Sequence, residues 1–355
     1  MGGGSTREAP LIQSFLGGLG TPLLLGSLAL AALAVTLVSI RATHLADAIA
    51  ERTGLGEAMV GAVVLGAATS LSGVVVSVTV AAQGDASFAV SNAVGGIAAQ
   101  TLFLAIGDLM YRRANLEHAA AEPANLFQAA QLMILLSLPL AAFAGPEIAY
   151  LGVHPVSLAM FLAYLAGLRA ANRVREDPMW RPVRTRDTRD EADDEEADPR
   201  PLPALVTAFA VLVAAMGVSG YAISQLGGAV AVRFDLASGL VGALLTAVVT
   251  SLPELVTTLT AIRRGALQLA VGGIIGGNTF DTLFLVASDV AYRDGSIYHA
   301  MAGTDLYWLA TGLLMTAVLL AGLIVRERTG PAGIGVESVL LVAIYAVALG
   351  VQLMA

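Results

Sequence analysis

The polar residues best suited to chemistry form two short groups in an otherwise apolar sequence. The first group is residues 250–254 (TSLPE), and the second is residues 276–282 (GGNTFDT). Pro253 lacks an N–H group and disrupts the preceding helical turn, which frees backbone carbonyls. Carboxylates, hydroxyls and free carbonyls are the hard oxygen ligands that Na⁺ and Ca²⁺ prefer. The two groups therefore predict a cation site with Glu254 and Asp281 as its charged ligands.

The composition indicates a membrane protein that crosses the bilayer several times. Of the 355 residues, 57% are hydrophobic and 13% are charged, and the mean hydropathy is +0.78. Hydropathy this high is typical of polytopic membrane proteins. The chain has no cysteine, which excludes disulfides and thiolate metal sites. The net charge of −8 argues against a nucleic-acid partner. From the hydropathy and the two polar groups we expect the lipid bilayer and inorganic cations as partners, and no cofactor.

Ten apolar segments are each long enough to cross a hydrocarbon layer of ~30 Å as a helix. Backbone groups in lipid need partners within their own segment, and a helix supplies them. The predicted fold is therefore an all-α membrane protein with ten transmembrane helices. The expected spans are residues 21–41, 56–82, 87–111, 126–144, 148–170, 203–222, 237–262, 267–291, 305–325 and 335–354.

The sequence repeats itself with an offset of 181 residues. Between residues 69–119 and 250–300, 19 of 51 aligned pairs are identical. The repeat divides the chain into a first five-helix repeat at 1–174, a linker at 175–202 and a second five-helix repeat at 203–355. Because five is an odd number, the second repeat enters the membrane with the opposite polarity. Transporters are often built from two such inverted repeats, with the ion site where they meet.

The arginines predict the orientation of the chain. With the N-terminus outside, 16 of the 19 basic residues, all of them arginine, fall on the inner side and three on the outer side. This is the positive-inside pattern of cell-membrane proteins. We therefore expect a multi-pass protein with both termini outside and the linker in the cytoplasm. The linker is densely charged and cannot form a core, so a solvated tether is expected, with a regulatory cation site as the alternative.

The two carboxylates are expected to lie deep in the membrane. Counted from the Arg263–Arg264 turn, Glu254 lies at ~12 Å and Asp281 at ~21 Å along straight helices. A break at the glycine pairs 272–273 and 276–277 is therefore expected to bring the carboxylates level. A buried carboxylate costs at least ~2.5–3.5 kcal/mol in a membrane, which favours a functional site over a purely structural hydrogen-bonded pair.

These motifs resemble those of a known transporter family. Residues 250–255 (TSLPEL) followed by 276–282 resemble the second alpha-repeat of the calcium/cation antiporter superfamily, which includes the sodium/calcium exchangers. Residues 69–73 (TSLSG) and 95–100 (GGIAAQ) resemble a degraded first alpha-repeat. The resemblance extends over nearly the whole chain, including ten spans, inverted halves and a cytoplasmic loop after the fifth span.

The resemblance also implies which residues hold the cation. Each repeat of the family has a Glu at the end of its first motif and a carboxylate or carboxamide 27 residues later. These positions are Glu254 and Asp281 in the second copy, and Gly73 and Gln100 in the first. The implied cation-binding residues are Glu254, Asp281, Thr250, Ser251, Thr69, Ser70, Gln100, Ser72 and Asn278, with Glu254 and Asp281 as the metal ligands.

The first copy departs from the family pattern. Gly73 replaces its acid, Ser72 replaces the preceding proline, and Ile97 stands where the family usually has Asn. Two carboxylates remain of three, and a charge of −2 matches one Ca²⁺, two Na⁺ or two H⁺. Loss of one ligand should weaken Ca²⁺ binding unless water or Ser72 fills the gap. We expect a secondary active antiporter, not an enzyme, that exchanges Ca²⁺ or another cation for Na⁺ or H⁺ with a stoichiometry other than three sodium ions to one calcium.

Two other functions stay open at this point. Residues 70–73 (SLSG) superficially resemble the turn of an intramembrane serine protease, but no histidine clearly lies near mid-span to act as a base. A non-transporting paralogue or a cation channel would also show a half-lost first site.

Asp108 and Asp289 match across the repeat near span ends, and we interpret them as solvated helix ends.

Overall fold

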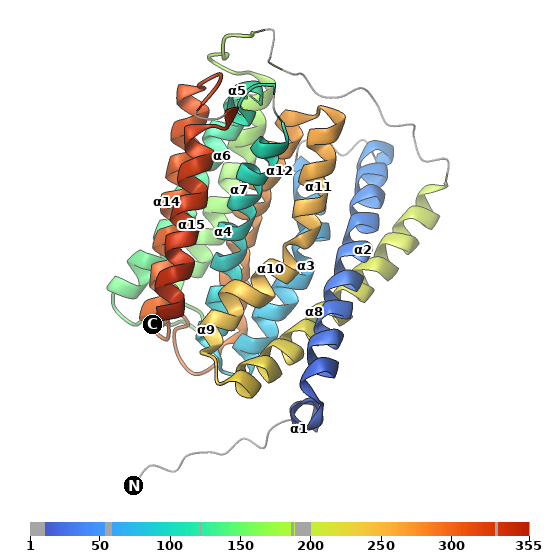
Figure 1. Ribbon diagram of the computed structural model, residues 1–355, viewed down its shortest axis with the longest axis vertical. Helices are drawn as coiled ribbons and strands as arrows, with labels where there is room; N and C mark the ends of the chain where they lie inside the picture. The colour runs from blue at the N-terminus through green and yellow to red at the C-terminus, as the bar shows by residue number, and fades with distance from the viewer. Residues whose placement is uncertain are drawn as a thin grey trace.

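Helices occupy the apolar segments in the computed structural model (Figure 1). The structure describes residues 11–53, 59–111, 113–120, 122–185, 188, 200–330 and 333–354. Residues 186, 187 and 189–199 of the expected linker lie outside this range. The helices of the first half are α1 (Leu11–Gly18), α2 (Thr21–Thr53), α3 (Met59–Ala82), α4 (Ala86–Met110), α5 (Leu116–Ala119), α6 (Pro123–Ala144) and α7 (Pro155–Glu176).

The second half repeats this pattern with two interrupted helices. Its elements are α8 (Leu202–Phe234), α9 (Ser238–Leu240), the π-helix η1 (Val241–Thr246), α10 (Ala247–Thr250), α11 (Leu252–Arg264), α12 (Leu267–Asp281), α13 (Leu283–Ala291), α14 (Gly303–Val325) and α15 (Val336–Met354). The helix bounds recur at the offset of the sequence repeat. Adding 181 to both ends of α2 gives α8, and adding 181 to the ends of α4 gives the first residue of α12 and the last of α13.

Three of the predicted segments differ from the observed helices by seven or more residues at one end. Helices α2 and α8 both have 33 residues, which is ~50 Å at 1.5 Å per residue and exceeds the ~30 Å hydrocarbon layer. The predicted span 21–41 ended at Arg41, its first charged residue, but a helix does not have to end where the membrane does. Helix α7 begins at Pro155, seven residues later than predicted, because His154 caps its first turn by accepting a hydrogen bond from the Val156 N–H.

The number of membrane spans is seven among the described helices by length and composition, or eight if the bent pair 238–250 and 252–264 counts as one. Two predicted spans fail this test. Side chains of the first half of α3 are not described, and the remainder, Thr69–Ala82, is a shorter apolar helix. Helix α7 ends in a turn that contains Arg173 and Arg175. The expected total of ten is therefore not established by the helices alone.

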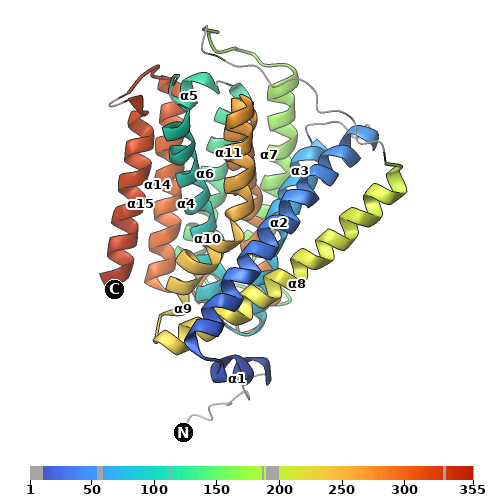
Figure 2. The ribbon, with the colours of Figure 1, turned by 45° about the vertical axis from the view of Figure 1, so that its right-hand side comes forward.

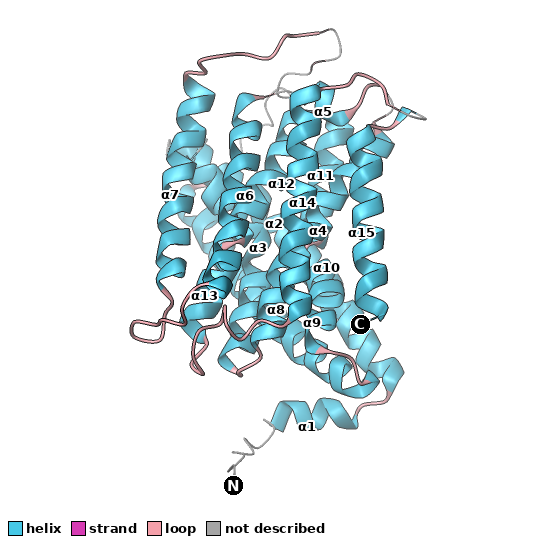
Figure 3. Ribbon diagram, turned by 90° about the vertical axis from the view of Figure 1, so that its left-hand side faces the viewer, coloured by secondary structure: helices cyan, strands magenta, loops and turns pink. Residues whose placement is uncertain are grey.

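The helices are arranged around α4. Within the apolar window of α4, 78% of the residues are buried inside the protein, against 22% in α2 and 11% in α8. Helices α2 and α8 pack on each other and run obliquely across one side of the molecule (Figure 2). The opposite side consists of α6, α7, α14 and α15, as Figure 3 shows. This leaves α2 and α8 as a separate, mostly lipid-facing pair and places α4 in the core.

Different helix ends lie at the two ends of the bundle. Helix α1 and the end of α15 lie at the lower end in Figure 1. Helix α5 and the end of α11 lie at the upper end in the same view. Helix α1 and the end of α15 therefore lie at the same end of the bundle. An even number of membrane crossings produces this placement.

Candidate cation-binding site

A small cavity lies where the interrupted helices of the second half meet α3 and α4 of the first half. Its empty volume is about 190 Å³. Its walls come from α3 and α4 of the first half and from α10 to α13 of the second. The lining residues are Ser70, Gly73, Asn92, Gly96, Gln100, Thr250, Ser251, Glu254, Asp281 and Phe284. The cavity thus joins the two sequence groups of the second half to their first-half counterparts.

Both predicted carboxylates line this cavity. Glu254 lies in the first turn of α11, directly after Pro253, and Asp281 is the last residue of α12. Only 5% of Glu254 and 1% of Asp281 is exposed. The chain bends by 44° between α10 and α11, at Ser251, and the missing N–H of Pro253 explains a bend at this place.

The expected break at the glycines is wrong. Helix α12 is continuous from Leu267 to Asp281 and passes through all four of these glycines. The interruption follows Asp281, where Thr282 separates α12 from α13. Glycine permits an unwound backbone but does not require one, and a helix retains its internal hydrogen bonds if it continues. The bend at Ser251 and the interruption at Thr282 are therefore the breaks that adjoin the two acids.

Two helix ends at the cavity add negative potential. Helix α10 ends at Thr250 and α12 ends at Asp281, and both residues line the cavity. The last carbonyls of a helix carry a partial negative charge that favours a cation. Interrupted helices in transporters use such ends, together with side-chain oxygens, to coordinate Na⁺ or H⁺.

The first half supplies neutral donors to the acids of the second half. Gln100 Nε2 donates to Asp281 Oδ2 at 2.6 Å and to Ser251 Oγ at 3.2 Å. Ser70 Oγ donates to Glu254 Oε1 at 3.3 Å. Ser70 is the repeat counterpart of Ser251, and Gln100 is the counterpart of Asp281. Residues that the repeat alone singled out therefore do contact the two carboxylates.

Three acceptor oxygens at the cavity have no hydrogen-bond partner. They are Gln100 Oε1, Glu254 Oε2 and Asp281 Oδ1, and all three are buried. A buried acceptor without a donor costs free energy, so such atoms call for an explanation. Hard oxygen acceptors that converge on a small cavity between two carboxylates are suited to a desolvated cation. Within the described residues, no group of three or more His, Cys, Asp or Glu side chains could hold a metal ion.

An aromatic ring occupies the place of the missing acid. A Cβ atom added to Gly73 would lie 2.5 Å from Cε2 of Phe284. The ring therefore fills the space that a larger residue at position 73 would need. The Phe284 ring, and not Ser72, therefore lies next to the position of the missing acid.

The structure separates three of the predicted ligands from the cavity wall. Ser72 does not line it, and its Oγ is buried without a partner. Asn278 also lies elsewhere and donates from Nδ2 to Thr101 Oγ1 at 2.9 Å. Thr69 is buried beside the cavity and makes a side-chain hydrogen bond to Glu254. Thr250 lines the cavity, but its hydroxyl donates to the carbonyl oxygen of Thr246 in its own helix at 2.9 Å.

Asn92 is a lining residue that sequence reasoning missed. Its Nδ2 donates to the Gly73 carbonyl at 3.3 Å and to Ser77 Oγ at 2.9 Å, and its Oδ1 accepts from Thr246 Oγ1 at 2.7 Å. The repeat gave no signal, because its counterpart is Gly273. The available signal was a carboxamide inside an apolar span, which is costly unless its partners are fixed. Thr246 ends the π-helix, an element that often occurs at functional sites.

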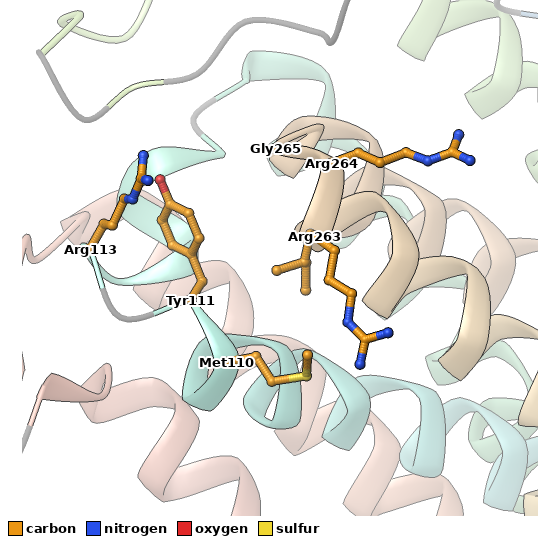
Figure 4. A pocket seen from close by; sticks show the side chains of 7 residues that line it. Met110, Tyr111, Arg113, Arg263, Arg264 and Gly265 are labelled. Atoms are coloured by element: carbon orange, nitrogen blue, oxygen red, sulfur yellow. The ribbon is translucent and has the colours of Figure 1, made fainter. Parts of the chain in front are cut away.

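A second, larger cavity lies near the end of the molecule that carries α5, and it has the opposite charge. Its empty volume is about 1050 Å³. Figure 4 shows Tyr111 and Arg113 on one side and Arg263, Arg264 and Gly265 on the other. The guanidinium groups make it unsuited to a bare cation. The smaller, acidic cavity is therefore the candidate for the cation site predicted from the sequence.

The fold and the site together define a membrane transporter scaffold for ions. Apolar helices surround a buried polar cavity between the two repeated halves. The chain belongs to the sodium/calcium exchanger protein family, whose model matches residues 16–168 and 204–354. The members of this family are ion exchangers and not enzymes.

Individual relatives agree with this membership. A protein named Putative antiporter CaxA, from Alkalimonas amylolytica, is 37% identical over 101 residues, which is 28% of this chain and 30% of that relative. The match thus spans less than a third of the relative. Among solved structures, the H⁺/Ca²⁺ exchanger CAX matches with a TM-score of 0.65 at 14% identity, over 97% of this chain and 89% of that chain. The sodium-calcium exchanger NCX_Mj matches with a TM-score of 0.59 at 16% identity, over 93% and 99%.

Proposed function

We propose that the chain is a secondary active antiporter that exchanges Ca²⁺ or another cation for Na⁺ or H⁺. The transported cation binds in the small cavity, between Glu254 and Asp281 of the second half and Ser70 and Gln100 of the first. The observation that carries this proposal is the set of three unpartnered acceptor oxygens around a cavity with two carboxylates. The relatives named as H⁺/Ca²⁺ and sodium-calcium exchangers make both driving ions reasonable.

The charge of the cavity limits what can be exchanged. The two carboxylates give −2, and the missing acid at position 73 is replaced by the ring of Phe284. This charge is neutralised by one Ca²⁺, by two Na⁺ or by two H⁺. An empty cavity with charge −2 would cross the membrane reluctantly, because uncompensated charge in the bilayer is costly. The cavity therefore enforces exchange, and the stoichiometry differs from three Na⁺ to one Ca²⁺.

The finer architecture of the proposal is a pair of inverted repeats with ten spans. The two five-helix repeats are residues 1–174 and 203–355, and residues 175–202 form a cytoplasmic linker. The recurrence of helix bounds at an offset of 181 residues supports the repeat. The placement of α1 and the end of α15 at one end of the molecule (Figure 1) supports an even number of crossings, with both termini outside.

Alternating access in this proposal is carried out by α2 and α8. They are the least buried of the long helices, and they pack mainly on each other and on α3. Their apolar surfaces let them slide along the core without exposing polar groups to lipid. The cavity on α3, α4 and α10 to α13 then stays fixed while its access changes sides.

Isotope flux in proteoliposomes tests the proposal. Purified protein is reconstituted, and uptake of ⁴⁵Ca²⁺ is measured under an outward Na⁺ gradient or a pH gradient, imposed one at a time. We expect at least one gradient to drive uptake, and Glu254→Gln to abolish it. Uptake that is independent of the Na⁺ and pH gradients and depends only on the Ca²⁺ gradient would instead identify a channel. Absence of any flux in a folded protein would identify a non-transporting paralogue.

A further inference from the structure

Two buried aspartates join the halves of the molecule at its opposite ends. Asp289 Oδ2 accepts a hydrogen bond from the backbone N–H of His154 at 2.8 Å, and Asp108 Oδ2 accepts from that of Gly335 at 2.7 Å. Both pairs are related by the offset of 181 residues. Each aspartate therefore holds the beginning of the last helix of the other half. Both are fully buried, so their interpretation as solvated helix ends is wrong.

Neutral groups donate to one oxygen of Asp289. Ser157 Oγ donates to Asp289 Oδ2 at 2.6 Å, and the hydroxyl of Tyr298 lies 2.7 Å from Ser157 Oγ. His154 stacks edge-on against Tyr298 with ring centroids 5.3 Å apart. This end of the molecule thus has one buried carboxyl group, Asp289, whose Oδ2 accepts from hydroxyl and backbone donors and whose Oδ1 has no partner.

Two further carboxyl groups, those of Glu117 and Glu337, lie near the contact between Asp108 and Gly335. The counterpart of Tyr298 is Glu117, and the residue that follows Val336 at the beginning of α15 is Glu337. Glu117 is 1% exposed and Glu337 is 6% exposed. Both carboxylate oxygens of Glu117 and Oε1 of Glu337 are buried without a hydrogen-bond partner. Asp108 also accepts a hydrogen bond from the Leu116 N–H through Oδ1 at 2.8 Å, so one aspartate holds backbone groups within two residues of both Glu117 and Glu337. Two carboxyl groups are therefore buried at one place, with no donor for three of their oxygens.

Two of the basic side chains near this pair, Arg326 and His118, contact groups other than the two carboxylates. Arg326 donates to the carbonyl oxygens of Val183 and His118. The His118 ring contacts the Arg326 carbonyl oxygen through Nδ1 and the Thr185 hydroxyl through Nε2. The titratable and charged groups of the elements packed here are Asp108 on α4, Glu117 and His118 on α5, Arg326, Glu327 and Arg328 after α14, and Glu337 on α15. Among the described residues, none donates a hydrogen bond to the Glu117 carboxylate.

Two ionised carboxylates cannot stabilise each other. Both are acceptors only, and their charges repel strongly in a medium of low dielectric constant. Burial, and next the negative charges of Glu337 and Asp108, raise the pKa of Glu117 well above its ordinary value. A hydrogen bond between the two carboxyl groups requires a proton on one of them, and this also favours the protonated form of Glu117. One proton shared by the two groups would supply the missing donor and remove one of the two charges.

We propose that Glu117 and Glu337 form a proton-binding site, separate from the cation cavity, in which a single proton bridges the two carboxyl groups. The bridge connects α5 of the first half to the beginning of α15 of the second, beside the Asp108 contact. In the orientation proposed above, this end of the molecule faces the cytoplasm. The site then couples the packing of α15 to cytoplasmic pH, whereas the Asp289 contact at the other end has no such pair.

The pH dependence of thermal stability tests this proposal without any transport. Since the folded state raises the pKa of Glu117, the bridge contributes stability at acidic pH and loses it as the pH rises through the raised pKa. We expect the melting temperature of the detergent-solubilised full chain to fall as the pH is raised. In Glu117→Gln, the amide donates to Glu337 at every pH, so the fall should shrink by about 2–4 °C.

A matched variant and a spectrum complete the test. Glu122→Gln removes a carboxylate at the same end that pairs with Arg175 at 2.9 Å, and it should keep the wild-type pH dependence. Infrared difference spectra at neutral pH should show one carboxylic acid C=O band that Glu117→Gln lacks. The proposal is overturned if Glu117→Gln keeps the full pH dependence, or if the band is unchanged. It is equally overturned if Ca²⁺ raises the melting temperature of the wild type more than that of Glu117→Gln, because the pair would then hold a metal ion.

Discussion

The two copies of the repeated motif place different chemistry on equivalent helical positions. The second copy contributes both carboxylates of the cavity, Glu254 and Asp281. The first copy contributes Gly73 and Gln100 at the same two positions. Gln100 donates to Asp281, and the space at Gly73 is occupied by Phe284. The comparison teaches that the scaffold is retained while one copy provides charge and the other provides orientation and shape.

The largest effect is expected from the charged copy. Glu254→Gln removes a carboxylate whose Oε2 has no partner other than the proposed cation. Loss of one charge from a buried pair typically costs ~2–5 kcal/mol, or roughly 30- to several-thousand-fold in affinity. We expect exchange of ⁴⁵Ca²⁺ in proteoliposomes to fall to the background, and Asp281→Asn to behave in the same way. Glu147→Gln, at an exposed carboxylate, should leave the rate unchanged; an equal loss there would mean that the assay reports folding.

A second prediction concerns the missing acid. Gly73→Glu alone should impair uptake and folded yield, because its Cβ would lie 2.5 Å from the Phe284 ring. The double variant Gly73→Glu with Phe284→Ala provides room for the new side chain, and we expect it to recover uptake with a different stoichiometry. If Gly73→Glu alone were fully active, the ring would not be the group that excludes an acid from the first copy.

Substitutions in the first copy, which has no carboxylate at the cavity, should reduce transport less than those in the second copy. Gln100→Leu removes the donor at 2.6 Å from Asp281, and a hydrogen bond to a charged group contributes ~1.5–3 kcal/mol. We expect the concentration of Ca²⁺ for half-maximal uptake to rise about tenfold or more. Gln225→Leu, at a buried glutamine of α8 outside the cavity, is the matched control. An equal rise in both variants would show that the effect is not specific to the cavity.

The smallest effect on transport is expected at Gly96 and Gly277, which occupy equivalent positions in the two copies. A Cβ atom at Gly96 would lie 3.4 Å from Ser251 Oγ, and one at Gly277 would lie 3.5 Å from Gln100 Oε1. Alanine at either position should narrow the cavity without unfolding the protein and should change the selectivity between Ca²⁺ and Na⁺ a few-fold at most. Gly217→Ala, with nothing within 4 Å, should have no effect on selectivity. A larger change at Gly217 than at Gly96 would contradict the geometry.

Sequence reasoning identified the charged part of the site more completely than the rest. Glu254 and Asp281 were predictable because a carboxylate in an apolar span is costly and needs a reason. Gln100 and Ser70 became candidates only through the repeat, and both contact the acids. Asn92 has no polar counterpart in the repeat, so it was missed. Membrane helices were predictable from hydropathy, whereas their ends depend on caps and on prolines.

Other features depend on packing, which a sequence does not specify. The ring of Phe284 could not be assigned to the space at Gly73 before the two halves were brought together. Asp108 and Asp289 lie near helix ends, but they are buried because each holds the first turn of a helix from the other half. The glycines of α12 allowed a break that did not occur, since the interruption follows Asp281.

The central claim is that a cavity of charge −2, provided by one copy alone, carries the exchanged cations. Its most direct test is the initial rate of ⁴⁵Ca²⁺ uptake into proteoliposomes at several imposed K⁺ diffusion potentials, under the gradient that drives uptake. One Ca²⁺ exchanged for two monovalent cations moves no net charge, so the account predicts a rate that is independent of the potential. A rate that rises steeply with an inside-positive or inside-negative potential, as three Na⁺ per Ca²⁺ would require, would contradict it.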